Sequence, residues 1–240
     1  MRDTLVKRLR AAGCVFAEDE AAEIRRVLGT DPVAVDRVVE ARTRGIPLEH
    51  ALGTARFAGV EVEVGAGVFV PRLRAESLVD EAVAAQPDAR VVVDLGCGSG
   101  AIAAALHARL PRAEVHAADV DPVALGYAAR NGRRHGFEAH LGDWWTALPR
   151  RLRGHVDLAV AYLPHVPTAK IDRIPGDYRH HEPGRAVDGG ADGLDALRRV
   201  MAGFDDWMSP EGLFATFLAD EQHLAAREVA GSRRVLFVFG

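Results

Sequence analysis

The fold is decided by one stretch of the chain, Val93-Asp94-Leu95-Gly96-Cys97-Gly98-Ser99-Gly100-Ala101, which joins an apolar run to a helical pattern. Glycine permits a sharp turn and lets a ligand lie against bare backbone at the carboxyl end of a strand. The spacing Gly-x-Gly-x-Gly differs from the Gly-x-Gly-x-x-Gly dinucleotide fingerprint. Asp94, which opens it, favours a ligand with an amino group over a pyrophosphate. The stretch therefore predicts a ligand site at the end of a strand in an open α/β sheet.

Acidic residues at the ends of the next two predicted strands extend this site. Asp119 lies about 20 residues beyond the loop, where a carboxylate accepts hydrogen bonds from ribose hydroxyls. Gly142-Asp143-Trp144 follows the next strand, so that Asp143 can meet an adenine amino group and Trp144 can cover the ring. Each carboxylate alone is more commonly a helix N-cap or a solvated loop residue. It is the succession of the glycine loop, Asp119 and Asp143-Trp144 along the chain that predicts a nucleoside ligand.

Apolar runs alternate with helical patterns along the rest of the chain. The predicted strands are 91–93, 114–118, 157–161, 212–218 and 235–239, and the helices between the first of them are 101–110 and 122–135. Such alternation indicates parallel strands joined by crossover helices. The predicted fold class is α/β, with a Rossmann-like sheet.

The N-terminal part has a different pattern. Its apolar residues recur at near-helical intervals, and Asp31-Pro32 has the N-cap and first-turn proline of a helix start. Short β-branched segments at 60–64 and 68–70 then predict a β-hairpin that ends at Pro71-Arg72. We therefore expect a small helical domain over residues 1–45, a hairpin linker over 46–72 and the Rossmann-like domain over 73–240.

Composition excludes several classes of protein. The formal net charge of −4 gives no global attraction for nucleic acid. No apolar run approaches the roughly 20 residues that cross a bilayer, and the N-terminus lacks a signal-peptide core, so we expect a cytoplasmic protein without membrane contact. Cys14 and Cys97 suggest neither a disulfide framework nor a metal site. Adjacent histidines such as His180 and His181, next to Glu182, do not readily aim at one ion, so no metal site is predicted.

Together these motifs resemble those of the class I methyltransferases that use S-adenosylmethionine, and more narrowly the HemK/PrmC group of protein-glutamine methyltransferases. The segments that carry the resemblance are 47–53, 67–72, the glycine loop, 119–122, 142–144 and, similar to the family's "EPR…ALDGG…DGL", 181–194. The last of these lies in a long irregular stretch, 164–192, whose length is typical of a functional loop.

The resemblance implies a small N-terminal helical domain, a Rossmann-like methyltransferase domain, and S-adenosylmethionine as the cofactor, with S-adenosylhomocysteine as its product. The cofactor-binding residues that it implies are Asp94, Gly96, Cys97, Gly98, Gly100, Asp119, Val120, Asp143, Trp144 and Tyr162. The substrate-facing residues that it implies are Phe69, Pro71, Arg72 and Glu182.

The catalytic stretch departs from the family. The family signature Asn-Pro-Pro-Tyr is replaced by Tyr162-Leu163-Pro164-His165. In the family the Asn side chain receives hydrogens of the substrate amide, and tyrosine lacks that carbonyl acceptor, so the alignment of a glutamine is altered. The candidate catalytic residues are Tyr162, Pro164 and His165. His165 either keeps an aromatic stacking role or serves as a general base near neutral pH.

The methyl acceptor is left open by these residues. One alternative is a protein acceptor, a second is a small molecule of specialised metabolism methylated at N or O, and a third is a silent cofactor-binding module. Methyl transfer is favoured because only the acceptor positions have changed. The chain closes soon after a predicted turn at 231–234, so we expect a shortened C-terminal hairpin. A missing edge strand would favour a homodimer.

Overall fold

The N-terminal part of the protein is helical, as its apolar spacing predicted. The computed structural model describes residues 4–174 and 179–239. Its first helices are α1 (Thr4–Ala11), α2 (Ala17–Leu28), α3 (Pro32–Thr43) and α4 (Leu48–Leu52). Asp31 begins α3 as predicted, because its carboxylate accepts hydrogen bonds from two N–H groups of the first turn. Leu9, Ile24 and Val38 pack between these helices and form a core of their own.

A six-stranded parallel sheet forms the main body. Its strands are β3 (Val91–Leu95), β4 (Glu114–Asp119), β5 (Glu138–Leu141), β6 (Val156–Ala161), β7 (Met208–Leu218) and β8 (Val235–Phe239). They lie in the order β5-β4-β3-β6-β7-β8, and every neighbouring pair is parallel. This is the doubly wound order, in which the chain changes direction across the sheet between β3 and β6. Such a switch point leaves a crevice outside the carboxyl ends of the strands, where ligands bind.

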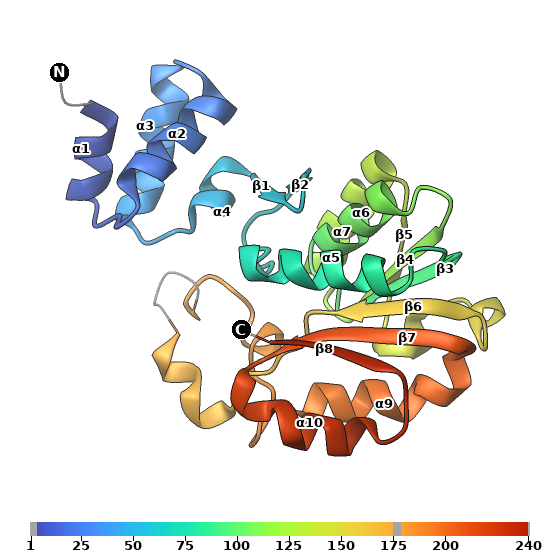
Figure 1. Cartoon of the computed structure of the whole chain (residues 1–240). Helices are drawn as coiled ribbons and strands as arrows, with labels where there is room; N and C mark the ends of the chain where they lie inside the picture. Colours follow the sequence, from blue (N-terminus) through green and yellow to red (C-terminus); the bar gives the residue numbers. More distant parts are fainter. Residues whose placement is uncertain (1–3, 175–178, 240) are drawn as a thin grey trace.

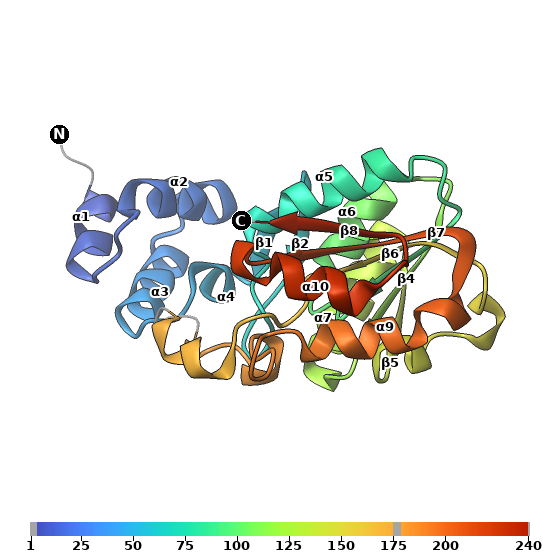
Figure 2. The ribbon, with the colours of Figure 1, turned by 60° about the horizontal axis from the view of Figure 1, so that its bottom comes forward.

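Helices cover both faces of this sheet (Figure 1). One face carries α5 (Glu76–Ala85), α6 (Ala101–Arg109) and α7 (Pro122–His135). The other carries α9 (Asp195–Trp207) and α10 (His223–Ala230). Short 3-10 turns are η1 (Leu73–Ala75), η2 (Trp144–Ala147), η3 (Arg150–Leu152), η4 (Thr168–Arg173), η5 (Gly184–Ala186) and η6 (Asp220–Gln222). The N-terminal helices lie on the side toward which β6, β7 and β8 run, beside the carboxyl ends of the strands (Figures 1 and 2).

The hairpin forms between different strands from those predicted. β1 (Thr54–Phe57) pairs antiparallel with β2 (Val60–Glu63), and residues 68–70 form no strand. Ala58 and Gly59 make the two-residue turn with φ of 46° and 87°, the left-handed pair that suits the twist of a hairpin. The prediction was wrong because Ala-Gly is a weaker turn signal than Asn-Gly. The Val70 N–H donates instead to the Glu182 carboxylate, which places 68–70 beside the pocket.

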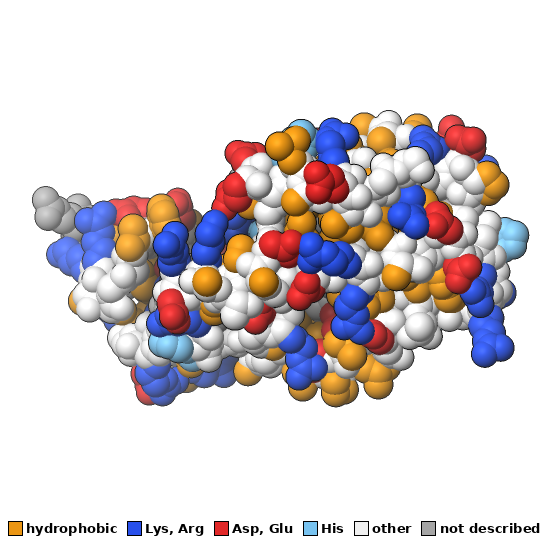
Figure 3. Space-filling model, turned by 90° about the horizontal axis from the view of Figure 1, so that it is seen from below, with side chains coloured by type: hydrophobic (Ala, Val, Ile, Leu, Met, Phe, Trp, Pro, Cys, Tyr) orange, Lys and Arg blue, Asp and Glu red, His pale blue; other side chains and the backbone are white. Residues whose placement is uncertain are grey.

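The C-terminal end of the sheet is simple. β8 pairs in parallel with β7 and forms the sheet edge, with no antiparallel strand beside it in the described part of the chain. None of the helices among the described residues combines the length and apolar character needed to cross a membrane. Figure 3 shows one face of the molecule, on which side chains of both charge signs are interspersed over the N-terminal helices and the main body alike.

Candidate active site

One pocket lies at the carboxyl ends of β3, β4 and β6, at the switch point of the sheet. It brings together most of the side chains that the sequence singled out. The predicted residues that line it are Phe69, Pro71, Arg72, Gly96, Cys97, Gly98, Asp119, Val120, Asp143, Trp144, Tyr162 and Pro164. Four predicted residues do not line it, namely Asp94, Gly100, His165 and Glu182.

The glycine loop and Asp119 hold each other in place on adjacent strands. The Gly98 N–H donates to one carboxylate oxygen of Asp119 at 2.7 Å, and the Asp121 N–H donates to the other at 2.8 Å. Gly96 and Gly98 have φ of 74° and 56°, which side chains rarely adopt. Burial raises the pKa of Asp119, although these backbone N–H groups oppose that shift by stabilising the carboxylate. The result is a fixed carboxyl group at the pocket wall, suited to a vicinal diol.

Trp144 closes this half of the pocket. Its ring lies so close to Gly96 that a Cβ atom there would sit 3.3 Å from the ring carbon Cζ3. Trp144 itself has a φ of 47°, an uncommon left-handed conformation for a tryptophan. The neighbouring Asp143 forms an ion pair with Arg199 of α9, which also lines the pocket. A flat ring and a carboxylate therefore both line this half of the pocket, and their role in binding adenine stays a prediction.

Two predicted residues of the loop lie outside the pocket lining. Asp94 is fully buried, and its carboxylate accepts a hydrogen bond at 3.0 Å from the Ala103 N–H in the first turn of α6. This oxygen holds the start of α6, the other carboxylate oxygen has no hydrogen-bond partner among the described residues, and Asp94 does not line the pocket. Gly100 faces Phe137, whose ring would lie 2.6 Å from a Cβ atom, so its role is close packing. Burial raises the pKa of Asp94 to about 7.

This raised pKa makes stability depend on pH. The folded pKa of Asp94 lies above its ordinary value of 3.8, so between these two values the folded state holds one proton more than the unfolded chain. We expect the free energy of unfolding to fall as pH rises, by roughly 2 kcal/mol from pH 5 to pH 7 through Asp94 alone. Urea unfolding of the wild type and Asp94→Asn across this range measures the effect, and the difference between the two proteins isolates Asp94. Parallel profiles would contradict it.

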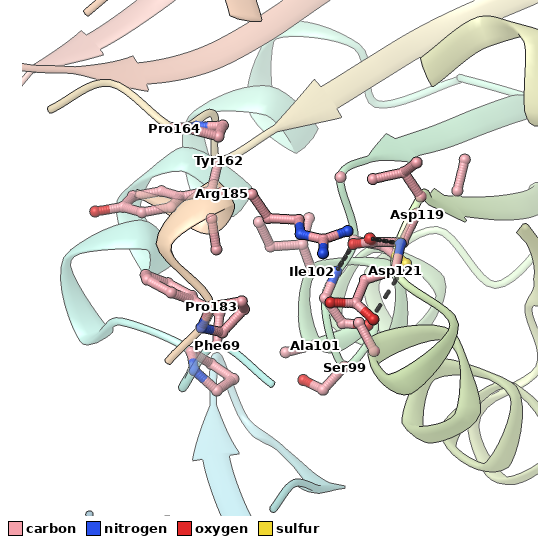
Figure 4. Close-up of a pocket in the computed structure, with 18 of the residues that line it drawn as sticks. Phe69, Ser99, Ala101, Ile102, Asp119, Asp121, Tyr162, Pro164, Pro183 and Arg185 are labelled. Atoms are coloured by element: carbon pink, nitrogen blue, oxygen red, sulfur yellow. Dashed lines mark hydrogen bonds between the residues drawn. The ribbon is translucent and has the colours of Figure 1, made fainter. Parts of the chain in front are cut away.

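Aromatic and cationic groups form the opposite half of the pocket. The rings of Phe69 and Tyr162 lie with centroids 6.0 Å apart, and the Arg72 guanidinium lies 4.3 Å from the Phe69 centroid. Burial raises the pKa of the Tyr162 phenol. Figure 4 shows the Tyr162 hydroxyl directed away from Asp119. The half of the pocket across from the glycine loop is therefore bounded by flat rings and a cation.

Glu182 lies behind this half and does not line the pocket. Its carboxylate accepts hydrogen bonds from the Val70 N–H at 2.9 Å and from Arg72 at 2.5 Å, with only 1% of the side chain exposed. Burial raises the pKa of Glu182, and the Arg72 charge opposes the shift. Its observed contacts are thus those of a positioning residue, which fixes segment 68–72 against the loop 181–188.

His165 also lies behind the pocket wall. Its Nδ1–H donates to the Leu163 carbonyl at 2.8 Å, and its ring meets the edge of Tyr162 with centroids 5.5 Å apart. Burial lowers the pKa of His165, which keeps the ring neutral. Of the two predicted roles, the stacking role fits this geometry. The general-base role does not fit, because the His165 ring does not line the pocket.

Several pocket residues were not predicted from the sequence. Arg185 and Pro183 come from the irregular stretch after β6, and Figure 4 shows Arg185 extending across the pocket toward Asp119. Two signals pointed to them, the length of that stretch and the resemblance of segment 181–194 to the family. A bridge between Val166 and Asp188 folds it back over the strand ends. Its residues 175–178 lie outside the described residues. Asp121 was missed because Asp-Pro indicates only a helix start.

A parallel doubly wound sheet, with a Gly-x-Gly-x-Gly loop after one strand and a pocket-lining carboxylate after the next, is typical of the class I methyltransferases. A family model described as a methyltransferase domain matches residues 92–181. A release factor glutamine methyltransferase from Moorella thermoacetica is 37% identical over 209 residues, which cover 83% of this chain and 72% of the relative. The chain belongs to the release factor glutamine methyltransferase family.

The matches to other relatives are shorter. The release factor glutamine methyltransferase of Geobacter sulfurreducens is 37% identical over 177 residues, which cover 73% of this chain and 61% of the relative. The chain thus spans less than two thirds of some of its curated relatives. A solved structure of a ribosomal protein L11 methylase from Lactobacillus delbrueckii subsp. bulgaricus is similar with a TM-score of 0.47 and 16% identity, covering 66% of this chain and 67% of that one.

Proposed function

We propose that the protein transfers a methyl group from S-adenosylmethionine to a protein acceptor. The observation that carries this proposal is a single pocket that joins two kinds of wall. One wall has the glycine loop, a fixed carboxylate and a tryptophan, and the other has aromatic rings and cations. Two ligands that must meet for group transfer would each find a complementary wall there.

The first wall fits S-adenosylmethionine. Both oxygens of Asp119 are aligned by backbone N–H groups, so their remaining lone pairs are free for the two ribose hydroxyls. Trp144 offers a ring face for adenine, and Asp143 is its neighbour. At Gly98 a Cβ atom would meet nothing within 4 Å, so the bare backbone there leaves room for the methionine portion. The cofactor supplies an electrophilic methyl group on a sulfonium, and the protein's part is to align the acceptor and exclude water.

The second wall would align the acceptor differently from a glutamine clamp. Tyr162 follows β6 where the family has asparagine, and it presents a ring between Phe69 and His165. We infer an acceptor side chain that lies against these rings. A protein acceptor is supported by the relatives, which are release factor methyltransferases, and by the N-terminal helices, which lie beside the strand ends (Figure 2). The helical domain would then contact the acceptor protein.

Transfer of label tests this proposal. The protein is incubated with methyl-labelled S-adenosylmethionine and, separately, with a purified release factor, the protein fraction and the metabolite fraction of a bacterial extract. We expect label in protein. Label only in metabolites would overturn the protein acceptor and favour a small-molecule enzyme. Label in neither, with S-adenosylhomocysteine still bound in calorimetry, would identify a silent binding module.

The variant Tyr162→Asn asks whether this position limits glutamine chemistry. Asparagine returns a carbonyl that accepts the amide hydrogens of the substrate, and misplacing a substrate by about 1 Å costs roughly 100-fold in rate. We expect release-factor labelling to rise by about that factor in Tyr162→Asn. Tyr162→Phe is the matched control, because it removes the hydroxyl without adding an acceptor, and it should give no rise. Equal rates in all three proteins would contradict the assignment.

A further inference from the structure

A second cluster of chemistry-bearing side chains lies away from the pocket, on β4 and the edge strand β5. In the parallel register His116 pairs with Glu138, and Ala118 pairs with His140. Side chains of a strand alternate between faces, so His116, Glu138 and His140 share one face of the sheet. That face is the one covered by η2 and α9, because Ala118 packs in the same core as Trp145 and Leu197.

One atom from each of the three side chains surrounds a common point. His116 Nδ1 lies 2.9 Å from His140 Nε2 and 3.6 Å from Glu138 Oε2, and the last two atoms are 3.9 Å apart. The circle through these three atoms has a radius of about 2.0 Å, and zinc bonds to histidine nitrogen and carboxylate oxygen are about 2.0–2.2 Å long. An ion at its centre would reach all three atoms at bonding distance.

The groups around the cluster orient it for an ion. The far nitrogen of His116, Nε2, lies 3.0 Å from the Glu114 carboxylate, which in turn accepts a hydrogen bond from Arg151 at 2.5 Å. A carboxylate on the outer nitrogen of a metal-binding histidine fixes the orientation and the tautomer of its ring. Two carboxylates and one guanidinium leave the cluster with a negative balance, which attracts a cation.

The competing explanation is a simple chain of hydrogen bonds. His116 is fully buried, and a buried ring nitrogen needs a partner, which His140 supplies by sharing one proton. These hydrogen bonds leave the position of Glu138 unexplained. Its side chain is 64% exposed, yet its carboxylate faces both ring nitrogens. For tetrahedral coordination the His116 and His140 nitrogens need only move apart from 2.9 Å to about 3.3 Å.

We propose that His116, Glu138 and His140 form a binding site for a divalent transition metal of the zinc type. Two imidazole nitrogens and one carboxylate oxygen would hold the ion, and water would complete its coordination because Glu138 lies at the surface. The site would tie the edge strand β5 to β4. It is separate from the proposed methyl-transfer pocket, whose lining includes none of these three residues.

Calorimetry with zinc chloride on metal-stripped protein tests the proposal, with cobalt(II) absorption as a second measurement. We expect one equivalent bound in the wild type, with cobalt bands of a four- or five-coordinate site. Glu138→Ala and His140→Ala should bind zinc more than about 100-fold more weakly, a larger loss than the roughly 10- to 100-fold cost of removing a hydrogen-bond partner of a metal ligand. Glu114→Gln should weaken binding by about 10-fold.

The control is His155→Ala, which removes an exposed histidine close to the cluster in the chain. Its zinc affinity should equal that of the wild type, and circular dichroism verifies the fold of each variant. Glu138→Ala alters a largely exposed side chain, whereas His140→Ala removes the partner of a buried His116 nitrogen, so the loss of zinc binding in Glu138→Ala is the stricter test. A wild type without one bound equivalent, or ligand variants that bind as the wild type does, would overturn the site.

Discussion

Replacing Asp119 by alanine should weaken binding of S-adenosylmethionine by about 100- to 1000-fold, which is about 3 to 4 kcal/mol. The proposed contact is a pair of hydrogen bonds from ribose hydroxyls to a carboxyl group, and hydrogen bonds to charged groups contribute about 1.5–3 kcal/mol each. The substitution also removes the acceptor of the Gly98 and Asp121 N–H groups, so the glycine loop loses its anchor. Calorimetry with cofactor and with its demethylated product measures the loss.

Two variants separate this effect from a general loss of negative charge. Asp119→Asn keeps one carbonyl acceptor and should fall between alanine and the wild type. Asp88→Ala removes an exposed carboxylate from the loop before β3 and should bind as the wild type does. An affinity of Asp119→Ala within threefold of the wild type would show that the ribose lies elsewhere, and the assignment of the first wall would fail.

The positions that sequence predicts well are those fixed by the backbone of the sheet. Gly96, Gly98 and Asp119 lie at strand ends, and the carboxyl ends of adjacent parallel strands meet at one sheet edge. Their proximity follows once the strands are known. Asp94 shows the limit of this logic, because successive side chains of a strand point to opposite faces. Asp94 lies within β3, on the face that α6 covers, so its carboxylate turns inward and accepts a hydrogen bond from the first turn of α6.

The positions that sequence predicts poorly depend on long-range contacts. Glu182 is 110 residues from Arg72, and only the folded chain reveals that it holds the pocket wall from behind. Residues 68–70 have strand-forming composition but receive Glu182 as their partner in place of a strand. His116 and His140 are 24 residues apart and form no motif, so the register of two strands is needed to bring them together.

The two halves of the pocket are held by separate interactions. Removing Asp119 and removing Glu182 should therefore have different effects on binding and stability. Asp119 is anchored by backbone groups of its own loop and of the glycine loop, so its removal should act mainly on the cofactor side of the pocket. Glu182 joins two distant segments through a side chain that is 1% exposed, facing an Arg72 side chain that is 16% exposed. Its removal should therefore act on stability and on the acceptor side, while cofactor binding is largely kept.

Glu182→Ala should lower the free energy of unfolding by about 3–5 kcal/mol, because it takes a buried carboxylate away from a guanidinium and leaves the Val70 N–H without its acceptor. Glu182→Gln keeps an acceptor for that N–H and should cost less. Urea unfolding measures both. Glu40→Ala, which breaks an exposed pair with Arg44, is the matched control and should change stability by less than about 1 kcal/mol.

A double-mutant cycle identifies the cause of the Glu182 effect. If the cost arises from the pair, Arg72→Ala in the Glu182→Ala background should recover part of the lost stability, since the buried cation is then gone as well. The single and the double variant should both bind S-adenosylhomocysteine within a few-fold of the wild type. Both should transfer methyl groups more slowly, because segment 68–72, which carries Phe69, is no longer held by Glu182. Additive losses in the cycle, or full transfer activity in Glu182→Ala, would mean that this ion pair does not position the acceptor wall.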